Sequence, residues 1–326
     1  MREALLSALR AVTQEERELL QGKELRRARY TSGRDFTIDG RKFLQGGKLM
    51  AVRAHTRFVA FPCHRHNYVE ILYMCEGSTT HILNGTERVT LRAGELLFLN
   101  QHCTHEIEPA GLGDVCVNFM VMPRFFHTAF DMMETGSALG DFIAGSLMQG
   151  DVPAKFLHYR VSDVVPVQNL VENMVWTLMN EREDSERLNR ITMGLLLQTL
   201  LGCDDRVDEG FPGRRMSGET ARILAYIEEH YADASLDALA RREGVPAYRL
   251  SRAVRRDTGY TFKELLQLRR FQAALTLLRR TPLSVSDVIA TVGYENTSYF
   301  YRRFRALYQM SPGEYRAAHA EHRPEA

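Results

Sequence analysis

The sequence predicts an α+β protein in which a small antiparallel β-barrel, flanked by helices, precedes an all-helical C-terminal domain. Three observations predict this. From about residue 36 to 119, apolar residues recur with a period of two, and turn signals separate the runs. After residue 219 the apolar period becomes helical. The polar, Gly-containing residues 202–218 lack periodicity. We therefore expect domains at 1–201 and 219–326, joined by a linker at 202–218.

The N-terminal domain is expected to begin with one or two amphipathic helices within residues 1–29. Thr13 and Glu16 have the spacing of a capping box. Asn84-Gly85 is a hairpin signal. Short, closely spaced strands of this kind predict a small barrel or jelly roll. The expected strands are Lys48–Thr56, Tyr68–Glu76, Ser78–Leu83, Glu87–Leu91, Glu95–Leu99 and Val115–Val121.

Helical periodicity returns between residues 123 and 201. Apolar residues recur at spacings of three and four from Val167 to Leu178, which predicts one apolar helix face. That face could be buried within the monomer, or two copies could share it across a twofold axis. We favour the second alternative, with a homodimer interface formed by Leu170, Val171, Met174 and Leu178.

The C-terminal domain reads as two helix-turn-helix units on one long helix. Ser235 is a good N-cap, Gly244 breaks the first helix, and a second helix follows to Thr258. Gly293 repeats this turn before a helix at Thr297–Tyr308. Between the units, Thr261–Arg280 is helical and about 30 Å long. Because one turn of DNA is about 34–36 Å, the two units could enter successive major grooves.

The charge distribution supports contact with nucleic acid. Net charge is +1, but residues 214–326 contain 19 Lys and Arg against 13 Asp and Glu. The preceding residues are acidic overall. No apolar run reaches transmembrane length and no signal-peptide pattern is present, so we expect a cytoplasmic protein without a membrane partner. The five cysteines are an odd number and are expected to be free thiols.

The C-terminal motifs resemble the AraC/XylS family of bacterial transcription regulators. The matching residues include Gly293-Tyr294, Ser298-Tyr299-Phe300 and Ser311-Pro312 in the second unit, and Thr258-Gly259-Tyr260 in the first. Pro246 departs from the family, which usually has Ser there. The resemblance implies binding to double-stranded DNA, and RNA polymerase as a partner if the protein is an activator. Arg252 and Arg302 are the expected guanine contacts. The DNA-binding positions are Tyr248, Arg249, Ser251, Arg252, Arg255, Thr297, Ser298, Tyr301, Arg302 and Arg305.

The barrel segment resembles a cupin. His64-Arg65-His66, Glu70 and Gly77 match the first cupin motif, and Gly94 and His105 follow the spacing of the second. That second motif departs from the family at Asn100 and His102, where Pro and Gly are usual. Within the AraC/XylS family, a cupin that precedes the DNA-binding domain is the common arrangement of sugar sensors. It implies an effector pocket formed by His64, His66, Glu70 and His105.

The same four residues are candidate metal ligands. Three imidazoles and a carboxylate suit Fe, Mn, Ni or Zn, so a divalent metal is a possible cofactor. The alternative is that they bind a polar ligand, or one another. Histidines two apart on a strand share a face, and Glu70 would return to that face if the strand stayed regular. Cys63, by alternation, would point outward.

The sequence therefore favours a sequence-specific transcription regulator, an activator, that responds to a small polar effector. A sugar or glycoside is the expected effector, and no catalysis is expected. The alternative is a metal-dependent cupin enzyme, isomerase or dioxygenase-like, fused to a DNA-binding domain. The complete ligand set supports that alternative, whereas the segment offers no clear acid or base partner for catalysis.

Overall fold

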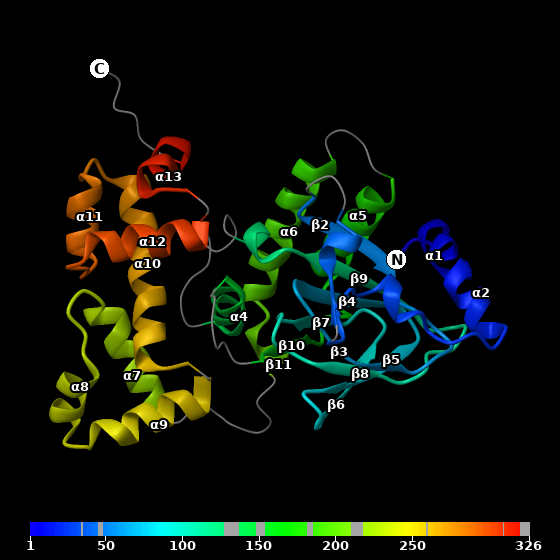
Figure 1. The fold of residues 1–326 in the computed structure, drawn as a ribbon, viewed down its shortest axis with the longest axis horizontal. Helices are drawn as coiled ribbons and strands as arrows, with labels where there is room; N and C mark the ends of the chain where they lie inside the picture. The colour runs from blue at the N-terminus through cyan, green and yellow to red at the C-terminus, as the bar shows by residue number, and fades with distance from the viewer. Residues whose placement is uncertain are drawn as a thin grey trace. The chain divides into compact units, whose positions relative to one another are not determined.

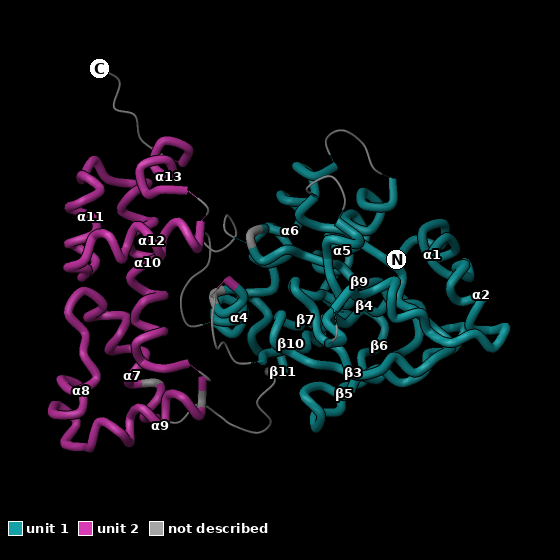
Figure 2. Tube along the Cα trace, viewed as in Figure 1, with its two compact units in different colours: residues 1–146, 153–212 teal, residues 147–152, 213–326 magenta. Residues whose placement is uncertain are grey.

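The computed structural model describes residues 1–33, 35–44, 48–126, 137–147, 154–180, 185–209, 218–258, 260–308 and 310–319. The chain divides into two compact units (Figure 2), one of residues 1–146 and 153–212, the other of residues 147–152 and 213–326. Of the predicted linker 202–218, residues 210–217 lie outside the described residues, whereas Val207–Glu209 form a short strand, β11, of the first unit. None of the described helices is long and apolar enough to cross a membrane.

Two sheets face each other in the first unit (Figure 1), so the α+β prediction with an N-terminal barrel is confirmed. Apolar side chains from both sheets fill the space between them, among them Leu72, Leu83 and Leu97. The five-stranded sheet has the order β1 (Thr37–Ile38), β3 (Phe61–His66), β8 (His105–Ile107), β5 (Ser78–Leu83), β6 (Glu87–Arg92). The six-stranded sheet has the order β11 (Val207–Glu209), β10 (Phe156–Tyr159), β7 (Leu96–Leu99), β4 (Val69–Glu76), β9 (Val115–Val121), β2 (Met50–Ala54).

The chain turns between β3 and β4, at Asn67 and Tyr68. The strand of His64 and His66 therefore does not continue regularly to Glu70, which lies on the expected strand Tyr68–Glu76, observed as β4. The turn is held because the Asn67 side chain accepts a hydrogen bond from the Gly40 amide at 2.8 Å and donates one to Asp39. Glu70 consequently reaches the interior from the opposite sheet.

Helices α1 (Glu3–Arg10) and α2 (Gln14–Leu20) precede the barrel. The predicted capping box is present at the start of α2, with reciprocal hydrogen bonds between Thr13 and Glu16. Short 3-10 segments lie at η1 (Arg27–Arg29), η2 (Gly40–Lys42), η4 (Pro123–Phe126) and η5 (Asp204–Arg206).

Three longer helices complete the first unit: α4 (Ala138–Leu147), α5 (Val165–Met179) and α6 (Ser185–Leu201). Helices α5 and α6 pack against each other. Val171 and Met174 are fully buried, so their predicted place in a dimer interface is wrong. Their methyl and thioether groups are instead part of the monomer core, and Leu170 and Leu178 are half-buried.

The second unit is all-helical. In Figure 1, α10 (Phe262–Arg280) runs between two groups of helices and connects them. The first group is α7 (Gly218–His230), α8 (Leu236–Glu243) and α9 (Ala247–Thr258). The second group is α11 (Val285–Thr291), α12 (Thr297–Tyr308) and α13 (Pro312–His319).

The N-cap serine and the two turn glycines of this unit have the roles predicted from the sequence. Ser235 caps α8 by accepting a hydrogen bond from the Ala238 amide, and Gly244 ends the helix in the left-handed region at φ 66°. Gly293 has φ 87°, and a Cβ there would lie 2.0 Å from the Ala232 carbonyl oxygen. The turn before α12 therefore packs directly on the loop between α7 and α8, and only glycine fits.

Candidate functional site

Two neighbouring strands present the histidines of the candidate pocket. On β3, His64 and His66 are buried, while the intervening Arg65 and the preceding Cys63 are exposed, as alternation predicts. On β8, His105 pairs directly with His64 across the ladder. The ligand-capable nitrogens of these three histidines all lie within 4.8 Å of one another.

Glu70 faces them from β4. Its Oε2 is 3.5 Å from His66 Nε2 and 3.4 Å from His105 Nε2, and neither contact is a hydrogen bond. Its other oxygen accepts a hydrogen bond from the Asn118 side chain on β9 at 2.9 Å. The four residues named from the sequence thus converge in the barrel interior, from both sheets.

Burial keeps the three histidines of this cluster uncharged at neutral pH. It lowers the pKa of His64 to about 4 and the pKa of His66 and His105 well below the ordinary value. Burial also raises the pKa of Glu70 to about 7, although Asn118 opposes the shift. The contacts of Glu70 with His66 and His105 are therefore not ion pairs at neutral pH.

The donor set fits a metal ion. Glu70 Oε2, His66 Nε2 and His105 Nε2 are buried without a hydrogen-bond partner, which is costly unless a further group satisfies them. Donor atoms bound at about 2.0–2.2 Å on one tetrahedral ion lie roughly 3.4 Å apart. The two Glu70 contacts match that separation. His64 Nδ1, by contrast, is bonded to the Pro62 carbonyl at 2.8 Å, which leaves its Nε2 for a ligand.

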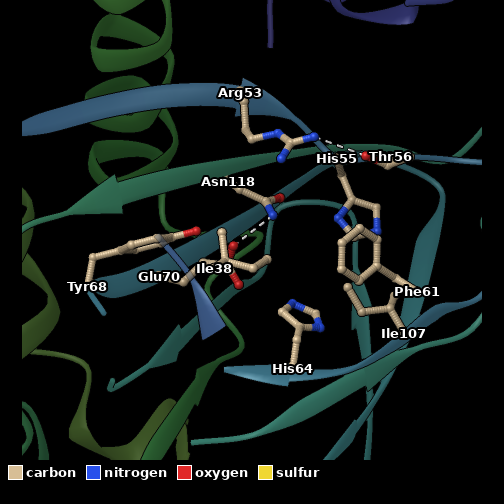
Figure 3. A pocket seen from close by; sticks show the side chains of 10 residues that line it. All are labelled: Ile38, Arg53, His55, Thr56, Phe61, His64, Tyr68, Glu70, Ile107 and Asn118. Carbon is tan, nitrogen blue, oxygen red and sulfur yellow. Dashed lines mark hydrogen bonds between the residues drawn. The ribbon is translucent and has the colours of Figure 1, made fainter. Parts of the chain in front are cut away.

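The adjoining cavity, shown in Figure 3, has a volume of about 20 Å³. That is enough for one water-sized group. Beside His64 and Glu70, its polar wall contains Arg53, His55 and Asn118, which sequence reasoning missed. Arg53 donates hydrogen bonds to Tyr30 and Thr56. Burial, and secondarily Arg53, lowers the pKa of His55 to about 4. Ile38, Phe61 and Ile107 form an apolar wall.

The expected DNA-contacting residues of the first unit lie on α9. Tyr248, Arg249, Arg252 and Arg255 are exposed, and Ser251 is half-buried. Two of these arginines have acidic neighbours. Arg249 is 2.5 Å from Glu219 of α7, and Arg255 is 3.6 Å from Glu264 of α10. Both would have to exchange these partners for a phosphate, whereas no described acidic residue is paired with Arg252 in the structure.

The corresponding residues of the second unit, on α12, are all exposed: Thr297, Ser298, Tyr301, Arg302 and Arg305. Asn296 caps the helix by accepting a hydrogen bond from the Tyr299 amide. The Tyr299 hydroxyl is bonded to Gln267 of α10, and the Arg302 guanidinium lies 5.7 Å from the Tyr299 ring. Tyr299 therefore supports Arg302 from beneath.

Comparison with known proteins finds a matching family for the barrel segment and another for the helical C-terminal segment. A family described as "AraC-like ligand binding domain" matches residues 47–122, and a family described as "Helix-turn-helix domain" matches residues 239–318. The "HTH-type transcriptional activator RhaS" of Escherichia coli (strain SMS-3-5) is 24% identical over 275 residues, covering 84% of this chain and 94% of the relative.

Solved structures of low overall similarity also match this chain. ToxT from Vibrio cholerae is 12% identical, with a TM-score of 0.33, and the match covers 84% of this chain and 98% of ToxT. The C-terminal domain of AraT, a response regulator from Geobacillus stearothermophilus, is 29% identical, with a TM-score of 0.32. That match covers 35% of this chain and 95% of the AraT domain.

Proposed function

Because the chain belongs to the AraC/XylS family of DNA-binding transcription regulators, we propose that it is an activator whose barrel binds a small polar effector, a sugar or glycoside. The observation that carries this proposal is the convergence of Glu70 and three histidines beside a cavity in the segment that matches a ligand-binding family. The effector acts by binding one arrangement of the protein better than another.

The size of the cavity limits how an effector enters. At about 20 Å³ it admits one hydroxyl-sized group, not a sugar ring. The apolar wall of Ile38, Phe61 and Ile107 must therefore move when a sugar binds. Ile38 is the residue best placed to do so, because β1 is a two-residue edge strand that pairs only with β3 among the described strands.

A divalent metal is the second candidate ligand, and the unpartnered atoms of Glu70, His66 and His105 favour it. When bound, such an ion would supply Lewis-acid chemistry. His64, His66, Glu70 and His105 would hold it. We propose binding rather than catalysis for this site, since the matched relatives are transcription regulators. Stoichiometric metal together with a turned-over product would favour the cupin-enzyme alternative.

The proposed DNA contacts are the exposed residues of α9 and α12, with Arg252 and Arg302 reading guanine and Arg255 and Arg305 binding phosphate. RNA polymerase is the proposed protein partner at a promoter. A second copy of the chain is proposed to dock on the exposed apolar face of α6, formed by Leu188, Ile191 and Leu195. Helices after the barrel often form the dimer interface in the resembling family.

A crossed pair of variants tests the division of roles. Arg302→Ala should lose about 1–3 kcal/mol of discrimination at one base pair and leave effector binding unchanged. His64→Ala should weaken effector binding and leave DNA affinity unchanged. Operator affinity is measured by gel shift on a selected sequence, and effector affinity by calorimetry against sugars and divalent metals. Normal operator binding by Arg302→Ala would refute the assignment of α12.

A further inference from the structure

The second unit contains one structural repeat. Buried positions of α7, α8 and α9 recur in α10, α11 and α12 at nearly constant offsets along the sequence. The corresponding buried pairs are Ile223 and Phe271, Ile227 and Leu275, Leu239 and Val288, Ala240 and Ile289, Leu250 and Phe300, and Val254 and Phe304. The turn glycines Gly244 and Gly293 also correspond, and both have a positive φ. A contact in one half of the repeat can therefore be compared with the contact at the same place in the other half.

The third residue of each recognition helix, α9 or α12, contacts the first helix of its half. In α9 this residue is Arg249, whose Nη2 lies 2.5 Å from Oε1 of Glu219 on α7. In α12 it is Tyr299, whose hydroxyl accepts a hydrogen bond from the Gln267 side chain on α10. Glu219 and Gln267 also correspond, because each lies about one helical turn before the first buried pair of the repeat. The ion pair and the neutral hydrogen bond are thus equivalent connections between equivalent helices.

Each connection is adjacent to a proposed base-reading arginine. Arg252 and Arg302 lie three residues after Arg249 and Tyr299, and residues three apart on a helix are neighbours on its surface. In α12, the guanidinium of Arg302 lies 5.7 Å from the Tyr299 ring. In α9, the corresponding neighbour of Arg252 is a second cation, which would repel it. The carboxylate of Glu219 compensates that second charge.

The alternative role for Arg249 is a contact with a DNA phosphate. Arg249 would then have to leave Glu219, and an uncompensated carboxylate would remain on the surface that approaches the phosphates, where it is repelled. Retaining the ion pair avoids this repulsion. Because the pair is largely exposed, it contributes little to the stability of the fold, so its geometry is the property that matters.

We propose that Glu219 and Arg249 are a positioning pair, the counterpart of Gln267 and Tyr299, which connects α9 to α7 and sets how Arg252 reaches its base. Arg249 is thereby distinguished from the other exposed residues of α9, because it acts through Arg252 and does not touch DNA. This inference rests on the proposed base contact of Arg252.

The test uses the full-length chain and a duplex that it selects from a random pool. The base pair read by Arg252 is identified first, as the position where Arg252→Ala loses discrimination. Glu219→Ala combined with Arg249→Ala removes the pair at unchanged net charge. This double variant should lose most of the discrimination at that base pair, which is about 5–150-fold for a bidentate contact. Glu219→Gln combined with Arg249→Tyr copies the pair of the other half and should restore the discrimination.

The salt dependence of affinity separates positioning from phosphate binding. Loss of one phosphate contact lowers the slope of log affinity against log salt concentration by about 1, whereas both double variants should keep the wild-type slope. Arg222→Ala combined with Glu243→Ala is the matched control. That ion pair joins α7 to α8, and its side chains are 54% and 20% exposed, against 59% and 21% for Arg249 and Glu219. The control should change neither discrimination nor slope.

A slope lower by about 1 in either Arg249 variant would overturn the inference, and the tyrosine variant decides this point even if the alanine variant fails to fold. Full discrimination in a folded alanine variant would overturn it as well. If Arg252→Ala changed discrimination at no base pair, the proposed base contact of α9 would be refuted, and the positioning pair with it.

Discussion

At the scale of single residues, a buried ion pair connects the N-terminal helices to the barrel. Glu16 of α2 accepts hydrogen bonds from Arg57 Nε at 2.7 Å and from its Nη2 at 3.0 Å, and both side chains are almost fully buried. The same guanidinium donates to the carbonyl groups of Arg10, Ala11 and Leu112. Such a buried ion pair contributes little more to the stability of the fold than an apolar pair of equal size would. Removing one partner, however, leaves an uncompensated buried charge, which is strongly destabilising.

We expect Arg57→Leu to lower the free energy of unfolding by about 3–5 kcal/mol, because Glu16 would be left buried without its cation. Arg88→Leu is the control, since its pair with Glu108 is exposed and should contribute less than about 1 kcal/mol. Urea unfolding at neutral pH measures both. Equal losses in the two variants would contradict this account.

The pair of Glu16 and Arg57 also makes the stability of the fold depend on pH in the acid range. Burial raises the pKa of Glu16, but hydrogen bonds from Arg57 and Thr13 outweigh burial and leave the pKa below its ordinary value of 4.5. The unfolded chain therefore binds a proton before the folded protein does. The stability from this pair is present above about pH 4.5 and is lost as the pH falls further. Arg57→Leu should abolish that acid-induced loss.

The sequence identified the pocket residues that belong to a cupin motif and missed the pocket residues that belong to no motif. His64, His66, Glu70 and His105 fit a motif with fixed spacing. His55, just after β2, and His81, on β5, are also buried, but neither has a second histidine beside it at strand spacing. A lone histidine in a strand is as compatible with a satisfied core residue as with a site. The structure shows that His81 reaches the pocket, because its Nδ1 lies 3.4 Å from Nδ1 of His105.

At the scale of elements, strands and helices were predictable where one periodicity continued without interruption. Ser78–Leu83, Val115–Val121 and Thr297–Tyr308 have the bounds expected from sequence. That the break between β3 and β4 carries β4 into the other sheet was not predictable, because the bonds of Asn67 with Asp39 and Gly40 that hold it are remote in sequence. Glu70 lies on the strand expected at Tyr68–Glu76, and the break brings it into the pocket from the sheet opposite His64 and His66.

Gly293 fixes how the two helix-turn-helix units pack on α10. Gly293→Ala would place a Cβ 2.0 Å from the Ala232 carbonyl, which Arg270 also binds at 2.9 Å. We expect Gly293→Ala to lower the free energy of unfolding by well over the roughly 1–2 kcal/mol that an alanine costs in the left-handed conformation alone. It should also weaken binding to a two-site operator by moving α12 relative to α9.

Gly244→Ala is the matched control for Gly293→Ala. Gly244 has a similar φ of 66°, but nothing lies within 4 Å of its added Cβ, so only the conformational cost remains. Urea unfolding and gel shifts on one-site and two-site DNA separate the effects. If both variants lost the same stability and bound the two-site DNA equally, close packing at Gly293 would not fix the geometry of the units.

At the scale of the whole molecule, the apolar stripe found in the sequence and the apolar surface in the structure are different faces. Four residues of the α5 stripe pack inside the unit: Val167, Val171, Met174 and Val175. The exposed apolar side chains include Val165, Trp176 and Met179 on α5 and a group on α6, Leu188, Ile191 and Leu195, each about half exposed. Their spacings of three and four place them on one helix face. Periodicity alone could not tell which of the two faces is buried and which is exposed, because α5 and α6 both have apolar residues at spacings of three and four.

A contiguous exposed apolar face of this kind is typical of an interaction surface. We expect Ile191→Glu to convert a homodimer to monomers, because two carboxylates would meet near the twofold axis of paired α6 helices. Leu20→Glu is the control: it introduces the same charge at an exposed leucine of α2 and should leave the dimer intact. Sedimentation velocity measures the assembly state of the full-length chain at micromolar concentration.

The same variant links assembly to DNA binding. A dimer engages its second half-site at a high effective concentration, so its affinity for paired half-sites exceeds that for one. Ile191→Glu should lose that excess and bind single half-sites as the wild type does. A dimeric Ile191→Glu would exclude the α6 face as the interface. A monomeric wild type that still favours paired half-sites would instead mean that DNA brings the two copies together.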